Sequence, residues 1–152
     1  MFEEEVKIYR LRDTAKVPHR AHLSDAGMDF FFAPANNEPR ALAPGQSAIL
    51  ATGVKMSVPE GMMLQIMNKS GIAAKRSLVT GACVVDRGYD GEIFVNLHNI
   101  GAEIQTIEPG MKLAQGVFIN ISSPSLIEIS QDKIYPRQTD RGSGALGSTG
   151  DR

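Results

Sequence analysis

The chain has 152 residues, 42% of them apolar, which is enough for one domain around a single buried core. The formal net charge of -1 excludes a strongly basic nucleic-acid-binding surface, and a single cysteine, Cys83, excludes an internal disulfide and a cysteine-rich metal site. No apolar run approaches the ~20 residues of a membrane span and the first residues are acidic, so we expect a soluble, cytoplasmic protein.

The chain opens with apolar residues over 6–11 that predict a strand, and a polar link through Pro18 follows. Small residues at 24–27 then lead into a hydrophobic strand predicted at 28–32. Asp29 stands near the start of that strand. An aspartate there usually bonds to nearby backbone N–H groups, so a turn-forming role and a functional role both stay open.

Proline–glycine turns divide the middle of the chain, and the apolar residues between them recur with a period of two. The turns lie at residues 43–45, 58–61 and 108–110, and the clearest alternation runs over 54–58 and 93–97. Short strands between regular turns predict an all-β sandwich or barrel. One short helix is expected over residues 71–78, with Ser70 as its N-cap.

The residues around this helix start, Asn68-Lys69-Ser70-Gly71, combine a cation, a hydroxyl and a glycine. Such a helix start suits a phosphate, because its exposed N–H groups and the positive end of the helix dipole both favour an anion. A plain capped helix is the alternative interpretation.

A strand, a tight turn and a second strand are predicted over residues 84–97. Gly88 and Gly91 allow the turn, which presents the carboxylate of Asp86 and the phenol of Tyr89 at the edge of the strands. By itself this pattern fits either an ordinary hairpin tip or a catalytic centre.

The last predicted strand spans residues 112–121, with Leu113, Val117 and Ile119 on one face. Gln115 shares that parity. A buried glutamine without partners costs about 1–3 kcal/mol, so Gln115 either forms hydrogen bonds in the core or faces a ligand.

From Pro136 the composition shifts to glycines and hydroxyl residues with too few apolar side chains to fold alone. A loose tail is one interpretation. The other is an arm that wraps a polyphosphate with backbone N–H groups, hydroxyls and the guanidinium of Arg141. We therefore expect a core at residues 1–135 and a flexible Gly/Ser-rich arm at residues 136–152.

In chain order, these stretches resemble the motifs of the trimeric dUTPase family. The matching segments are Ala26-Gly27-Met28-Asp29, Asn68-Lys69-Ser70-Gly71, Asp86-Arg87-Gly88-Tyr89-Asp90-Gly91, Lys112-Leu113-Ala114-Gln115 and Arg141–Gly150. The resemblance implies a jelly-roll homotrimer that hydrolyses dUTP to dUMP and pyrophosphate, which limits uracil in DNA and supplies dUMP for thymidylate synthesis. Each active site would lie at a subunit boundary and be closed by a neighbour's arm.

The resemblance also implies the role of each residue at the reacting end. Asp86 would activate the water that attacks the α-phosphorus, and Tyr89 would pack against the deoxyribose and exclude a 2′-hydroxyl. The residues expected at the base are Thr80, Gly81, Ala82 and Leu146.

The remaining residues would hold the triphosphate and its metal. The expected phosphate-binding residues are Lys69, Ser70, Gly71, Gln115, Arg141, Ser148 and Thr149. Mg²⁺ would be held mainly by the phosphates and waters, with Asp29 reaching one such water, as fits the reluctance of magnesium to dehydrate.

Four positions depart from the usual family pattern. Lys69 stands where arginine is usual, which keeps the charge and loses the planar fork. Asn68 replaces a proline, Cys83 replaces a common glycine, and Leu146 replaces the phenylalanine that stacks on uracil. We expect these changes to bear on affinity and base choice more than on the chemistry.

The nearest alternative is a dCTP deaminase, or a bifunctional deaminase and dUTPase, which shares the fold and needs a glutamate beside the base. Glu92 is the candidate, but it follows the turn, and Asp86 together with Tyr89 favours hydrolysis. A regulatory nucleotide-binding trimer and a purely structural jelly roll also stay open, although a structural jelly roll leaves the Gly/Ser/Arg tail unexplained.

Overall fold

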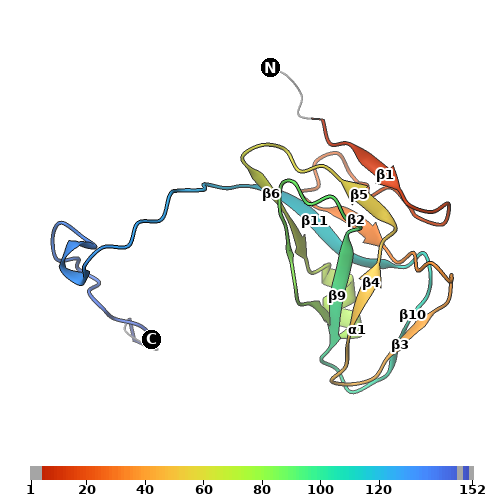
Figure 1. Ribbon diagram of the computed structural model, residues 1–152. Coiled ribbons are helices and arrows are strands. Elements are labelled where there is room, and N and C mark those ends of the chain that lie inside the picture. The colour runs from red at the N-terminus through yellow and green to blue at the C-terminus, as the bar shows by residue number, and fades with distance from the viewer. Residues whose placement is uncertain (1–4, 147–148, 151–152) are drawn as a thin grey trace. The chain divides into compact units, whose positions relative to one another are not determined.

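The computed structural model describes residues 5–146 and 149–150, and the chain divides into two compact units, Met1–Ser122 and Ser123–Arg152. The strands of the described residues all lie in the first unit, as does the α-helix (Figure 1). The strands are β1 (Ile8–Arg10), β2 (Met28–Phe31), β3 (Arg40–Leu42), β4 (Ser47–Ala51), β5 (Val54–Met56), β6 (Met62–Met67), β7 (Leu78–Thr80), β8 (Val84–Val85), β9 (Phe94–Asn99), β10 (Gln105–Ile107) and β11 (Lys112–Asn120). The prediction of an all-β fold with one short α-helix is confirmed.

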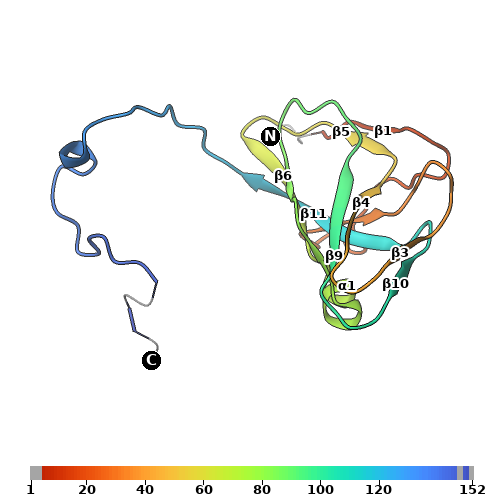
Figure 2. The same ribbon diagram turned by 60° about the horizontal axis from the view of Figure 1, so that its bottom comes forward.

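Two antiparallel sheets form the body of this unit. One has the strand order β2-β11-β6-β8 and the other β4-β9-β7, while β1 pairs with β5 and β10 pairs with β3. Helix α1 (Ser70–Arg76) packs on β7 and β11 at one end of the sheets (Figure 2).

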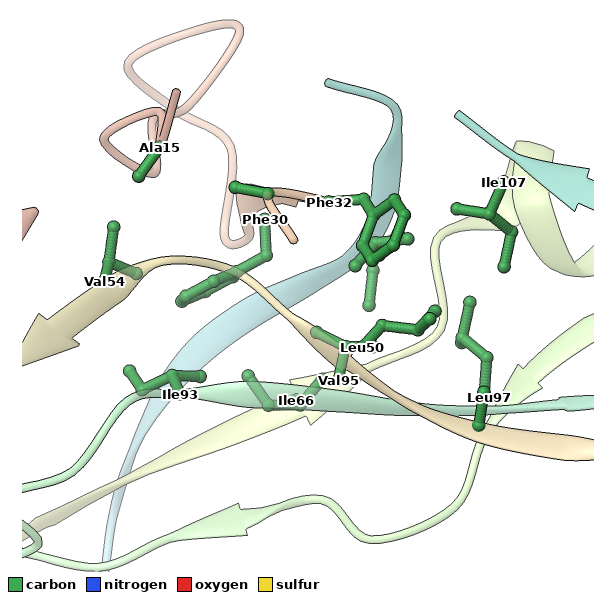
Figure 3. Packing of buried hydrophobic residues seen from close by; sticks show 14 of the residues in the cluster. Ala15, Phe30, Phe32, Leu50, Val54, Ile66, Ile93, Val95, Leu97 and Ile107 are labelled. Carbon is green, nitrogen blue, oxygen red and sulfur yellow. The ribbon is translucent and has the colours of Figure 1, made fainter. Parts of the chain in front are cut away.

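The core lies between the sheets, and the period of two observed in the sequence decides which residues enter it. Leu50 in β4 and both Val95 and Leu97 in β9 are buried, while their sequence neighbours face outward. Figure 3 shows Leu50 and Val95 in the same apolar cluster as Phe30 and Ile66 of the other sheet. Burying a side chain of this size contributes about 1.5–3 kcal/mol, so the sandwich rests mainly on these contacts.

Strand β11 departs from regular alternation. Its pairing register with β2 shifts between Lys112 and Ala114, and both Leu113 and Ala114 are buried. The prediction that Gln115 shares the core face with Leu113 is therefore wrong, because the extra residue of a bulge reverses the parity. Gln115 is half-buried and lies directly opposite Asp29.

Helix α1 begins one residue earlier than expected. Lys69, in an extended conformation, is the N-cap, and its carbonyl accepts the N–H groups of Ile72 and Ala73. The prediction of Ser70 as N-cap is wrong, since Ser70 is already helical. The helix ends at Ser77, which takes a positive φ of 53°.

In the second unit the described residues contain one 3₁₀-helix, η1 (Gln131–Lys133), and no strand. They are exposed throughout residues 123–146 and 149–150. Among the helices of the described residues, none has the length and apolar character to cross a membrane.

Candidate active site

The turn that carries Asp86 and Tyr89 follows β8 and is closed by local hydrogen bonds. The Tyr89 N–H donates to the Asp86 carbonyl at 3.2 Å, with Gly88 between them at a φ of 89°. The Tyr89 hydroxyl donates to the Glu92 carbonyl at 2.8 Å. A Cβ at position 91 would collide with the end of the Tyr89 side chain, so glycine there lets the tyrosine keep this hydrogen bond.

The end of the turn is anchored by Glu92. Its carboxylate accepts hydrogen bonds from Arg12 Nη1 at 2.7 Å, from Arg12 Nη2 at 3.1 Å and from the Gly53 N–H at 2.7 Å. Arg12 also donates to the Ala33 carbonyl at 2.6 Å. These bonds tie the Asp86–Tyr89 turn to the N-terminal segment and to the connection between β4 and β5.

A cavity of about 210 Å³ lies beside this turn. It is lined by Ile66, Ala82, Cys83, Val84, Val85, Asp86, Tyr89, Glu92, Ile93 and Phe94. The structure therefore brings Asp86 and Tyr89 together with residues 82–85 around one cavity. A larger hollow of about 680 Å³ lies between β1, β5 and residues 87–90, and Tyr89 lines both spaces whereas Asp86 lines only the smaller one.

Residues 80–82, expected at the base, are held in place by hydrogen bonds that their backbone N–H groups donate. The Thr80 N–H donates to Asn68 Oδ1 at 2.8 Å, and the Ala82 N–H donates to Asn96 Oδ1 at 3.1 Å. The Gly81 N–H donates to the Asn96 carbonyl at 2.9 Å. A Cβ at Gly81 would collide with Asn96 Oδ1 and with the ring of His98, so the close approach requires glycine.

Asp29 lies in a second group of residues, between two lysines. Lys69 Nζ is 2.7 Å from Oδ1, and Lys112 Nζ is 2.9 Å from Oδ2. Both contacts are ion pairs, and Oδ2 is a buried acceptor that receives no hydrogen bond from the described residues. Burial by itself would raise the pKa of Asp29, but the contacts and charges of Lys69 and Lys112 outweigh burial and lower this pKa below 3.8.

Gln115 joins this second group to the loop before α1. Its Nε2 donates to the Asn68 carbonyl at 2.9 Å. Gly27 lies against the other side of the amide, where a Cβ would collide with Gln115 Oε1. Asn68, whose side chain accepts from Thr80, therefore connects the predicted phosphate-binding residues to the predicted base-reading loop.

Sequence reasoning did not assign a role to Lys112, Arg12 or Asn96. Lys112 reaches Asp29 through a bulge, and Arg12 and Asn96 make contacts with residues distant in the chain. These features depend on tertiary structure and therefore produce no local pattern in the sequence. The unusual asparagine at position 68 was a signal, because its side chain accepts the Thr80 N–H, which a proline could not do.

The predicted residues of the arm belong to the second unit. Arg141, Leu146 and Thr149 are exposed there, and Ser148 lies outside the described residues.

A metal site made by the protein alone is not apparent. Residues 5–146 and 149–150 contain no group of three or more His, Cys, Asp or Glu residues able to hold a metal ion. The residues present do fit a hydrated cation carried by a ligand, because Asp29 Oδ2 is an acceptor without a hydrogen bond that could receive one from a metal-bound water.

The chain is similar to known proteins along almost its whole length. The family model described as dUTPase matches residues 13–150. The deoxyuridine 5′-triphosphate nucleotidohydrolase of Clostridium tetani is 36% identical over 99% of both chains, and that of Alkaliphilus metalliredigens is 37% identical over 95% of this chain and 96% of the relative.

Solved structures of phage enzymes share the fold. A mutant of the Staphylococcus bacteriophage 80alpha dUTPase with dUpNHpp superposes with a TM-score of 0.82 at 26% identity, over 96% of this chain and 98% of that one. A mutant dUTPase from phage phi11 of S. aureus, described with a structural Mg(II) ion, gives 0.75 at 28% identity, over 84% of this chain and 98% of the other. The prediction of a jelly-roll-like fold is confirmed.

Proposed function

Because the chain belongs to the dUTPase family, we propose that it hydrolyses dUTP to dUMP and pyrophosphate. The observation that carries this proposal is the single cavity lined by Asp86, by Tyr89 and by residues 82–85. The carboxylate of Asp86 suits a water, the ring of Tyr89 suits a sugar, and the neighbouring strand edge suits a flat base.

Asp86 is the residue to which we assign activation of the water. A phosphoanhydride is already reactive, so the protein has to orient the water in line with the leaving group and stabilise charge. Asp86 accepts a proton of the attacking water, which aligns the oxygen with the α-phosphorus. Tyr89, whose hydroxyl is fixed on the Glu92 carbonyl, packs its ring against the sugar and leaves no room for a 2′-hydroxyl.

The base is read by the backbone of residues 80–83, with Leu146 of the arm providing apolar contact. Asn68 and Asn96 accept the N–H groups of Thr80, Gly81 and Ala82, which holds this loop in one conformation and leaves its remaining backbone groups for the base. Thr80 supports the loop through its N–H rather than contacting the base with its side chain.

Phosphate oxygens are bound by Lys69, by Ser70 and Gly71 at the start of α1, and by Gln115 through water. The arm adds Arg141, Ser148 and Thr149. Mg²⁺ is the proposed cofactor, since bound to the phosphates it neutralises part of their charge, and Asp29 accepts a hydrogen bond from its hydration shell.

The proposed assembly is a homotrimer in the cytoplasm, with a core of residues 1–135 and an arm of residues 136–152 that closes a neighbour's site. The outer face of β4 and β9 supports a subunit interface, because Ile49 and Phe94 are 73% and 43% exposed there. Exposed apolar residues between Leu126 and Tyr135 support contact with another subunit as well.

The deaminase alternative is not favoured. A deaminase needs a free glutamate beside the base, but the carboxylate of Glu92 is occupied by Arg12 and by the Gly53 N–H. Pyrophosphate release measured with Mg²⁺ against each deoxynucleoside triphosphate and UTP tests the proposal. We expect turnover of dUTP well above that of every other nucleotide. Ammonia release from dCTP, or no preference for dUTP, would contradict it.

A further inference from the structure

The ionic group formed by Asp29, Lys69 and Lys112 contains two positive charges and one negative charge. One ammonium neutralises one carboxylate, yet Lys69 and Lys112 lie 2.7 Å and 2.9 Å from its two oxygens. Asp29 is only 4% exposed, whereas the side chains of Lys69 and Lys112 are 30% and 44% exposed. Both lysines therefore reach from a buried carboxylate to the surface, and the group presents a net positive charge to a ligand.

The bulge in β11 places Lys112 in this group. In a regular strand, residues 112 and 115 would face opposite sides of the sheet. The register shift after Lys112 instead puts it on the side of Gln115 and Asp29, while Leu113 and Ala114 fill the core. Gln115 bonds to the loop before α1, so Lys112 faces the region that the proposed function assigns to the triphosphate.

The two lysines differ in how firmly they are held. Lys69 is the N-cap residue of α1 and lies within the loop that Asn68 ties to Gln115 and Thr80. Lys112 is more exposed, at 44% against 30% for the side chain of Lys69, and it lies at the start of β11, outside that loop. An ammonium has three N–H donors, so Lys112 can begin to bind a phosphate oxygen before it leaves the Asp29 carboxylate. It therefore has an anionic partner at each stage of the movement.

We propose that Lys112 is a phosphate-binding residue that is held on Asp29 until the triphosphate arrives. In the free protein Lys112 cancels the repulsion that a bare Asp29 would exert on the incoming anion. When the triphosphate binds, Lys112 turns to a phosphate oxygen and leaves Asp29 Oδ2 for a water of the accompanying cation. This inference rests on the proposed function.

The experiment measures binding, so that it does not depend on turnover or on metal. Isothermal titration in EDTA compares a non-hydrolysable α,β-imido analogue of dUTP with dUMP, for the wild type and for Lys112→Met, which keeps the length of the side chain and removes its charge. We expect the affinity for the analogue to fall about tenfold or more, because a charge-assisted hydrogen bond is lost, and the affinity for dUMP to fall much less.

Two further variants identify the cause. Lys112→Arg keeps the charge and should recover most of the affinity for the analogue. Lys75→Met removes a charge from an exposed position of α1 and should leave both affinities within about twofold, as a screened surface charge does. Thermal melting of each variant verifies that it is folded.

The results separate this inference from the proposed function. Unchanged affinity for the analogue in Lys112→Met, or an equal loss for dUMP and the analogue, would overturn the role of Lys112 while dUTP hydrolysis by the wild type still stands. A wild type that neither binds the analogue nor hydrolyses dUTP would overturn both.

Discussion

The ion pair between Arg12 and Glu92 should decide both the stability of the core and the position of the Asp86–Tyr89 turn. The two side chains are 22% and 14% exposed, and the carboxylate of Glu92 accepts from Arg12 through both oxygens and also from the Gly53 N–H. Removing one partner of a fully buried pair costs about 3–5 kcal/mol. Partial exposure lowers this figure, so we expect Glu92→Gln to cost about 2–3 kcal/mol of stability. The amide carries no charge, and its N–H₂ group would face an arginine that has only donors and cannot accept a hydrogen bond.

Thermal melting and steady-state kinetics measure the two effects together. A loss of about 2–3 kcal/mol corresponds to a fall in Tm of about 6–12 °C for a core of this size. We also expect kcat/KM for dUTP at about 25 °C to fall about tenfold, because Tyr89 is held by the carbonyl of the same residue and small displacements of a reacting group are costly.

A second ion pair on the same turn provides the control. Lys55 Nζ lies 2.5 Å from Asp90, whose side chain is 89% exposed, so Lys55→Met should change stability by less than about 0.5 kcal/mol. If Glu92→Gln and Lys55→Met had the same Tm, the Arg12–Glu92 pair would be no more than a surface contact and the reasoning would be refuted.

Three other predictions test the assigned roles. Asp86→Asn should abolish turnover and preserve nucleotide binding, and more than about a tenth of the wild-type kcat, equivalent to ~1.4 kcal/mol of barrier, would contradict the role of the carboxylate. Deletion of residues 141–152 should lower kcat strongly and Tm little, and unchanged activity would mean that the arm has no part in the site. Leu146→Phe should raise kcat/KM for dUTP about threefold to tenfold, since offset stacking adds about 0.5–1.5 kcal/mol, while a loss of activity would show a pocket shaped for leucine.

Strands such as β5 and β9 and the Asp86–Tyr89 turn could be predicted because their causes are local. Alternation of buried and less buried residues produces β5 and β9, and Gly88 permits the positive φ of the Asp86–Tyr89 turn. These causes all act within about ten residues, which is the range of hydrophobic period and turn chemistry.

The ionic contacts could not be predicted because their causes are distant. Arg12 and Glu92 are 80 positions apart, and no local sequence pattern around either residue indicates that the two form a pair. The bulge at Leu113 depends on how β11 packs on β2, so the parity of Gln115 and the place of Lys112 follow from the core rather than from the strand sequence.

Asp29 provides a pH test of the ionic group, through stability rather than activity. Its pKa is lowered in the folded protein, so the unfolded state binds more protons as the pH falls. The stabilisation is therefore complete above the ordinary value of 3.8, and it is lost as the pH drops through the lower pKa of the folded state.

Asp29→Asn removes this contribution, and because Lys69 and Lys112 can turn to solvent we expect it to cost only about 1–2 kcal/mol at neutral pH. Urea denaturation of the wild type and Asp29→Asn between about pH 7 and pH 3 should show a stability difference that is constant down to about pH 4.5 and shrinks below it. A difference that stayed constant to the acid end of this range, or that grew as the pH fell, would mean that Asp29 stabilises the fold by packing rather than by charge.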